Sequence, residues 1–163
     1  MNILGIDPGL ERIGVSIVEK VNQQYVLKYN RLIKTSSKDP FIKRLNAAYT
    51  ELFDIIKNNR IDGASIEKLF FTKNVKTAMD VSEVRGVLQL ALYQNSIPIY
   101  EYTPLQVKQG LVGYGRATKQ QIQQVLKMML KLDEVPKSDD VADSMALAIV
   151  HINTYQTLSK IKC

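Results

Sequence analysis

The 163-residue sequence contains a single cysteine, a single histidine and no tryptophan. Because the one cysteine is Cys163, an internal disulfide is excluded, and we expect a reducing, cytoplasmic setting. Met1 and Asn2 lead directly into a strand-like run without a basic segment, so we expect no secretory signal peptide. No apolar run approaches the ~20 residues of a membrane-spanning helix, and low-complexity tracts and internal repeats are absent. The sequence therefore predicts a globular domain with no membrane partner.

Positive charge is in surplus, while the rest of the composition is ordinary. Lysine and arginine outnumber aspartate and glutamate by 22 to 16, which gives a formal net charge of +6. A surplus of this size favours an anionic partner such as nucleic acid, although many basic proteins bind none. With 45% hydrophobic residues, the chain can bury one sizeable core. We expect a single domain over residues 1–158 and a short C-terminal tail at residues 159–163.

Hydrophobic periodicity predicts an α/β fold. The run from Asn2 to Asp7 is typical of a short buried strand, and the turn pair Pro8-Gly9 ends it. Asp39 is the expected N-cap of the first helix, with Pro40 as its first residue. The predicted elements, in order, are strands at 2–7, 11–20 and 24–35, a helix from residue 40, a strand at 63–71, a helix at 74–95, a strand at 97–102, short helices around 110–119, and a final helix headed by acidic residues. This order predicts a mixed five-stranded sheet with helices on both faces.

The final predicted helix contains a carboxylate in an apolar setting. Between residues 141 and 152 only Asp143, Ser144 and His151 are polar, so we expect most of this helix to be buried. An unpaired buried carboxylate is costly and must meet a cation or take up a proton. His151 lies eleven residues beyond Asp140, roughly 16 Å along the helix axis, which is too far to share an ion. We therefore expect His151 to be a packed or surface histidine.

Carboxylates also follow apolar runs elsewhere in the chain. Asp7 ends the first strand, Glu67 follows the run "ASI", and Asp140 stands three residues before Asp143. The ends of neighbouring central strands and the start of a helix packed across them can converge on one place. Carboxylate oxygens suit Mg²⁺ or Mn²⁺, and two such ions can act together on a phosphate. The spacing therefore suggests a divalent-metal site; the alternative is that the acidic residues at the head of the helix only cap it.

Four segments together resemble a known family. The segments "GIDPGLERIGVSIV", "IEKLFFTKN", "QVKQGLVGYG" and "DDVADSMALAI" resemble, in order, the motifs of the RuvC family of bacterial Holliday-junction resolvases, which have a ribonuclease-H-like fold. The resemblance implies that the four acidic metal ligands of the family fall on Asp7, Glu67, Asp140 and Asp143, with two Mg²⁺ ions that Mn²⁺ can replace. The family pattern D-x-x-D is met by "DVAD", which favours Asp140 over Asp139 and leaves Asp139 as the cap.

The resemblance also implies a substrate and partners. It implies a homodimer that binds a four-way DNA junction, makes paired symmetric nicks with 5′-phosphate and 3′-hydroxyl ends, and works with the RuvA–RuvB branch-migration complex. Phe70 matches an aromatic residue that stacks on bases, and Lys108 and Lys119 match lysines near the active site that hold phosphate. Arg116 is a DNA-binding candidate from charge and loop position alone. Met79, Val87 and Leu90 lie off the apolar stripe of the long helix and pack either on the sheet or on a second subunit.

Three other functions are compatible with parts of the sequence. Actin-like and sugar-kinase phosphotransferases also open with an aspartate-glycine hairpin, but they need two such lobes around the nucleotide. A non-catalytic junction-binding protein would not need all four carboxylates. A ribonuclease-H-type or RNA-processing nuclease would share the fold but differ in its preference among junction, duplex and RNA–DNA hybrid.

Overall fold

A five-stranded mixed sheet forms the centre of the computed structural model, which describes residues 1–69 and 75–161. The strands are β1 (Asn2–Asp7), β2 (Arg12–Val21), β3 (Gln24–Lys34), β4 (Gly63–Glu67) and β5 (Ile99–Tyr102), in the spatial order β3-β2-β1-β4-β5. The first three strands are antiparallel, whereas β1, β4 and β5 run parallel. Asn22 and Gln23 connect β2 and β3 with positive φ at both residues, as a tight hairpin turn requires.

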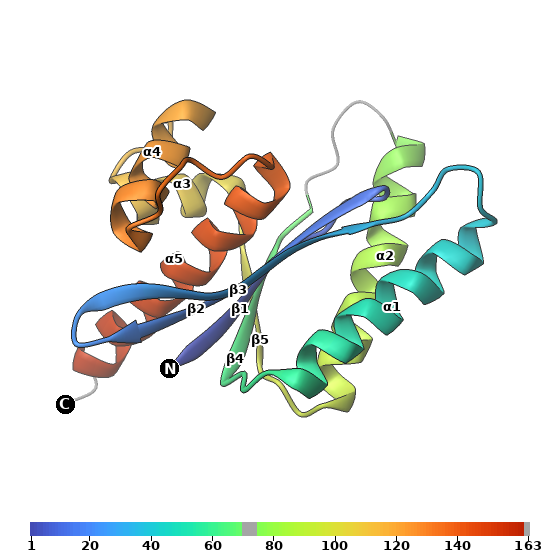
Figure 1. The fold of residues 1–163 in the computed structure, drawn as a ribbon, viewed down its shortest axis with the longest axis horizontal. Helices are drawn as coiled ribbons and strands as arrows, with labels where there is room; N and C mark the ends of the chain where they lie inside the picture. The colour runs from blue at the N-terminus through green and yellow to red at the C-terminus, as the bar shows by residue number, and fades with distance from the viewer. Residues whose placement is uncertain (70–74, 162–163) are drawn as a thin grey trace.

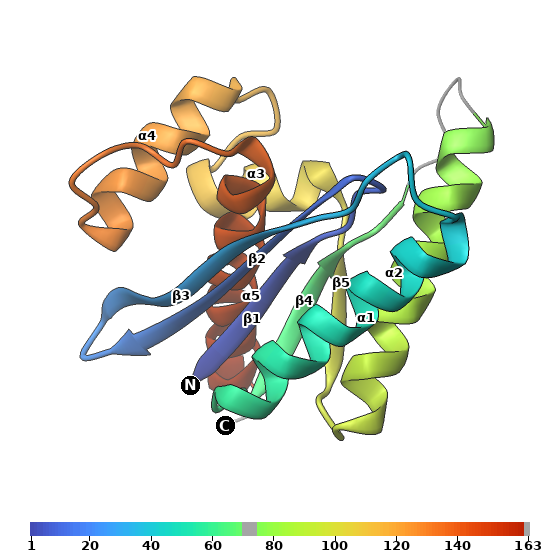
Figure 2. The same cartoon turned by 45° about the vertical axis from the view of Figure 1, so that its right-hand side comes forward.

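Helices cover both faces of the sheet (Figure 1). On one face lie α1 (Phe41–Asn58) and α2 (Val75–Gln94), and on the other α3 (Pro104–Val112), α4 (Lys119–Leu130) and α5 (Asp139–Ile161). Figure 2 shows α5 running along the sheet behind β1, with α1 and α2 on the opposite side. Each face has its own cluster of buried apolar residues. The predicted mixed five-stranded sheet with helices on both faces is confirmed. Within the described residues, no helix has the length and apolar character needed to cross a bilayer.

Among the element boundaries that differ from the sequence-based prediction are those of the first helix, the fourth strand and the final helix. The first helix begins at Phe41 with Pro40 at its N-cap, so Asp39 does not cap it. The carboxylate of Asp39 instead pairs with the Lys43 ammonium at 2.7 Å. The fourth strand ends at Glu67 rather than continuing to residue 71. Finally, α5 extends to Ile161, into the segment predicted as a C-terminal tail.

Two glycines set how closely α5 approaches the sheet. A Cβ atom at Gly5 or Gly14 would lie 1.8 Å from the carbonyl oxygen of Ser144 or Asp140, respectively. Only a residue without a side chain therefore allows the first turns of α5 to lie directly on β1 and β2. Beside these glycines, the buried hydroxyls of Ser16 and Ser144 form a 2.5 Å hydrogen bond, which satisfies both polar groups away from water. The start of α5 is thereby fixed against the strands.

Candidate active site

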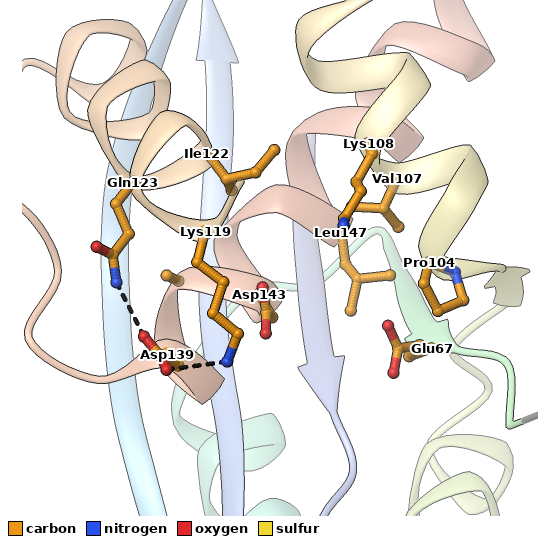
Figure 3. Close-up of a pocket in the computed structure, with 11 residues that line it drawn as sticks. Glu67, Pro104, Val107, Lys108, Lys119, Ile122, Gln123, Asp139, Asp143 and Leu147 are labelled. Atoms are coloured by element: carbon orange, nitrogen blue, oxygen red, sulfur yellow. Dashed lines mark hydrogen bonds and ion pairs between the residues drawn. The ribbon is translucent and has the colours of Figure 1, made fainter. Parts of the chain in front are cut away.

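The carboxyl ends of two neighbouring strands bring two acidic side chains to one edge of the sheet. Asp7 is the last residue of β1 and Glu67 the last of β4, and these strands pair in parallel. Asp143 lies about one turn into α5, whose start is held on the sheet beside Gly14. Figure 3 shows the carboxyl groups of Asp143 and Glu67 projecting into the same opening. Three of the four predicted metal ligands therefore approach one another from distant parts of the sequence.

Burial and mutual repulsion make these three carboxyl groups hard to ionise. Burial raises the pKa of Asp7 from 3.8 to about 8, and the negative charges of Glu67, Asp143 and Asp140 contribute further. Burial likewise raises the pKa of Glu67 from 4.5 to about 7, with Asp143 adding to the effect. The pKa of Asp143 is also raised, chiefly by burial, although the positive charge of Lys119 opposes the increase. Without a cation, the cluster therefore retains protons near neutral pH.

Asp140, the fourth predicted ligand, is paired with an arginine. The Arg12 Nε donates to Asp140 Oδ2 at 2.8 Å, and the Ser138 hydroxyl donates to the same oxygen at 3.1 Å. Arg12 Nη2 also donates to Ser138 Oγ at 3.1 Å, so the three residues form one hydrogen-bond network. Oδ2 of Asp140 is therefore already occupied by two hydrogen-bond donors.

Two lysines face the carboxylates across a small pocket. Lys108 on α3 and Lys119 on α4 line a pocket of about 140 Å³ together with Glu67 and Asp143. Lys119 Nζ pairs with Asp139 Oδ2 at 3.0 Å, and Gln123 Nε2 donates to the other oxygen of Asp139 at 2.9 Å (Figure 3). The pocket thus combines positive groups suited to phosphate oxygens with carboxylates suited to a metal ion.

The donor chemistry of the cluster fits a hard divalent cation. Asp7, Glu67, Asp140 and Asp143 supply only carboxylate oxygens, the ligands that Mg²⁺ and Mn²⁺ prefer. The raised pKa values of Asp7 and Glu67 are those expected of a carboxylate cluster that needs positive charge. Within residues 1–69 and 75–161, no three His, Cys, Asp or Glu side chains are already gathered closely enough to hold an ion. In this arrangement Asp140 is paired with Arg12 at 2.8 Å.

Comparison with known proteins identifies the family. Residues 3–151 match the family model for crossover junction endodeoxyribonuclease RuvC. The curated RuvC of Halothermothrix orenii is 49% identical over 157 residues, covering 96% of this chain and 94% of that protein. The chain belongs to the RuvC family. In fold, it is similar to Thermus thermophilus RuvC, with a TM-score of 0.88, 28% identity and 96% of both chains covered. A structure of T. thermophilus RuvC with a Holliday junction substrate also gives a TM-score of 0.88, at 26% identity and with 96% of both chains covered.

The DNA-binding candidates of this RuvC chain lie in different settings. Lys108 and Lys119 lie beside Glu67 and Asp143, in the same pocket. Arg116 is exposed in the loop between α3 and α4. Phe70 lies outside the described residues. The roles of all four in DNA binding stay predictions.

His151 is packed rather than part of the metal site, as expected. Its side chain is 2% exposed, and its Nδ1 is 2.8 Å from the Tyr102 hydroxyl. The ring of Tyr100 stacks on it with a centroid separation of 4.1 Å. Burial lowers the pKa of His151 to about 4, so the ring is neutral at physiological pH.

Arg12, Asp139 and Gln123 form polar contacts around the candidate site that the sequence did not predict. Arg12 is separated from Asp140 by 128 residues, so no local spacing could indicate their ion pair. Asp139 was expected only to cap the helix, but its carboxylate holds both Lys119 and Gln123. The one usable signal for Arg12 is its position five residues after Asp7, because the hairpin returns it to the same end of the sheet.

Proposed function

We propose that this chain is a metal-dependent endonuclease that resolves Holliday junctions by paired symmetric nicks during recombination and repair. The observation that carries the proposal is the convergence of Asp7, Glu67 and Asp143 in a member of the RuvC family. The T. thermophilus relative whose structure contains a Holliday junction substrate supports the substrate class. The activity is assigned to a single nuclease domain over residues 1–158 that acts in the cytoplasm, where chromosomal DNA is accessible.

In this proposal the four carboxylates bind metal and the two lysines bind the phosphate. Asp7, Glu67, Asp140 and Asp143 would hold two Mg²⁺ ions, for which Mn²⁺ can substitute. When bound, the metal supplies Lewis-acid chemistry for the attack of water on a phosphodiester. Lys108 and Lys119 bind oxygens of the phosphate and keep it against the carboxylate cluster. Water adds to phosphorus and the bond to the 3′ oxygen breaks, which leaves a 5′-phosphate and a 3′-hydroxyl.

Further DNA contacts lie around this centre. Phe70 follows Glu67 by three residues, so a stacked base there would lie near the scissile phosphate. Arg116 adds a positive charge in the loop before α4 that a neighbouring phosphate can reach. A stacked base and a bound phosphate position the DNA and do not by themselves select a sequence.

A second copy of the chain makes the symmetric cut possible. On α2, the side chains of Met79, Leu90 and Tyr93 are 57%, 49% and 78% exposed, and their spacing of eleven and three residues places them on one face of the helix. We propose that this helix contributes to a homodimer interface, so that two active sites face opposed strands of one junction. Cooperation with the RuvA–RuvB branch-migration complex is proposed from family membership.

A synthetic four-way junction tests the proposed function directly. The protein is incubated with end-labelled junction, with and without Mg²⁺, and the nicks are mapped on all four strands. We expect paired incisions at symmetric positions, only with metal, that DNA ligase can seal. Linear duplex and an RNA–DNA hybrid of the same sequence serve as competing substrates.

Two outcomes would redirect the proposal. Preferential cutting of the hybrid would favour a ribonuclease-H-type function. Junction binding without cutting, unchanged in Asp7→Asn, would indicate a non-catalytic junction-binding protein. If the proposal is right, Asp7→Asn binds the junction and does not cut it. Sedimentation of the wild type and of Tyr93→Glu tests the dimer separately, since a charge at the interface would leave the variant monomeric.

A further inference from the structure

Arg12 forms a direct ion pair with Asp140, one of the four candidate metal ligands. Within residues 1–69 and 75–161, Asp140 is the one candidate ligand whose carboxylate has a direct ion pair, 2.8 Å to Arg12 Nε. The side chain of Arg12 is 50% exposed and that of Asp140 26%, so the pair sits at the rim of the site. Asp7, Glu67 and Asp143 are deeper and are affected by one another's charge. Asp140 is therefore held by an ion partner of its own, although its charge still contributes to the raised pKa of Asp7.

The fold fixes where Arg12 stands. Arg12 is the first residue of β2, and two residues later Gly14 pairs with Asp7 across the sheet. Residues two apart on a strand point to the same face, so Arg12 shares the face of Gly14, on which α5 begins. Ser138, just before α5, accepts from Arg12 and donates to Asp140, which holds the guanidinium and the carboxylate in one network.

We propose that Arg12 is a positioning residue that competes with the divalent metal for Asp140. The inference rests on the proposed function, because that function assigns Asp140 to the metal site. In the metal-free protein, Arg12 occupies Oδ2 of Asp140 and leaves three carboxylates facing one another. Divalent metal displaces Arg12, and only then does Asp140 join the inner three.

Displacement has a second consequence for DNA. A half-exposed guanidinium released from its carboxylate is free to form charge-assisted hydrogen bonds with a phosphate. Metal binding therefore uncovers a phosphate-binding group, and a junction phosphate that captures Arg12 helps to free Asp140. Because such coupling is reciprocal, the junction and the metal strengthen each other's binding through the same side chain.

A metal titration tests the competition without any cleavage assay. Mn²⁺ binding to the DNA-free protein is measured by calorimetry or by the electron paramagnetic resonance of free Mn²⁺, in about 0.15 M salt at pH 8. Arg12→Gln should tighten Mn²⁺ binding by about two- to five-fold, the range set by an exposed ion pair. Arg31→Gln is the matched control, because its pair with Glu51 has a length of 2.9 Å and a similar exposure, 54% and 34%.

A double-mutant cycle separates the competition from a simple loss of positive charge. In an Asp140→Asn background the competition no longer exists, so Arg12→Gln should leave Mn²⁺ affinity nearly unchanged. Tightening of equal size in both backgrounds would overturn the proposal, as would unchanged or weaker Mn²⁺ binding by Arg12→Gln alone.

Junction binding in EDTA tests the second consequence. With the wild-type network intact, Arg12→Gln should change junction affinity by less than about two-fold, because Arg12 is already paired. In the Asp140→Asn background Arg12 is free, so Arg12→Gln should weaken junction binding by about two- to five-fold. The slope of log affinity against log salt concentration should fall by the amount expected for about one phosphate contact. Equal weakening in both backgrounds would refute the release of Arg12. If the wild type does not bind junctions, the proposed function fails, while the Mn²⁺ cycle still decides the competition.

Discussion

Replacing Asp7 with asparagine should stabilise the metal-free protein, although it removes a carboxylate of the candidate active site. The pKa of Asp7 is raised from 3.8 to about 8 in the folded state, chiefly by burial. At pH 7 the unfolded chain would be fully ionised at this position, whereas the folded chain must keep the proton. The interval from 3.8 to pH 7 corresponds to about 4 kcal/mol of lost folding free energy, because each pH unit is worth about 1.4 kcal/mol.

The direction of the pH dependence follows from the same pKa values. A carboxyl group with a raised folded-state pKa makes the folded state bind more protons, so stability falls as pH rises from about 4 to about 8. An asparagine side chain does not titrate, so the Asp7→Asn variant should gain up to about 4 kcal/mol at pH 7 in EDTA and much less at pH 5. For a chain of this size the gain corresponds to a Tm rise of roughly 5–15 °C.

Differential scanning calorimetry across pH 5 to 8 in EDTA measures this effect. Asp54→Asn, which neutralises an exposed carboxylate on α1, is the matched control and should change Tm little. In saturating Mg²⁺ at pH 8 the wild type should have a higher Tm than Asp7→Asn, because the wild type binds the metal more tightly and gains stability from it. An Asp7→Asn variant that is no more stable than wild type at pH 8 would refute the reasoning from burial and repulsion.

Three further predictions concern neighbouring residues. Asp143→Asn should reduce the rate of junction cutting by at least about 10²-fold. The variant should keep the far-UV circular dichroism spectrum of the wild type and have a higher Tm in EDTA. A normal rate of cutting would show that Asp143 is not part of the site. Gly14→Ala should push the first turn of α5 outward, because the new Cβ would lie 1.8 Å from the Asp140 carbonyl oxygen, and cutting should fall by about 10²-fold. In the control Gly86→Ala the new Cβ meets nothing within 4 Å, and Tm should stay the same or rise. Thr118→Ala removes the capping box of α4 and should cost about 1 kcal/mol in urea unfolding, which Thr118→Ser should largely restore.

The sequence singled out Asp7 and Glu67 as candidates from short hydrophobic runs, although it did not predict that the fourth strand ends at Glu67. Asp7 and Glu67 each follow an apolar segment, and the carboxyl ends of parallel neighbours meet at one edge of a sheet. The burial of α5 was also readable, since Val141 to Ile152 is almost entirely apolar, and the structure buries this stretch except for the partly exposed Asp143. Both predictions depend only on local patterns.

Contacts between side chains of distant segments were beyond local patterns. The ion pairs of Arg12 with Asp140 and of Lys119 with Asp139 join residues 128 and 20 positions apart. The start of the first helix was predicted wrongly because Asp39-Pro40 has the local chemistry of a cap. The carboxylate of Asp39 instead pairs with Lys43, four residues later in the first turn of α1.

The docking of α5 on β1 and β2 makes the site a property of the whole chain. Asp7 is synthesised 133 residues before Asp140, and Gly5 and Gly14 allow these distant segments to meet. A ribosome-bound fragment that has already formed the β2–β3 hairpin therefore carries half of the carboxylates at most and none of the helix that completes them. A nuclease built in this way cannot attack DNA until α5 has been synthesised and has docked on the sheet.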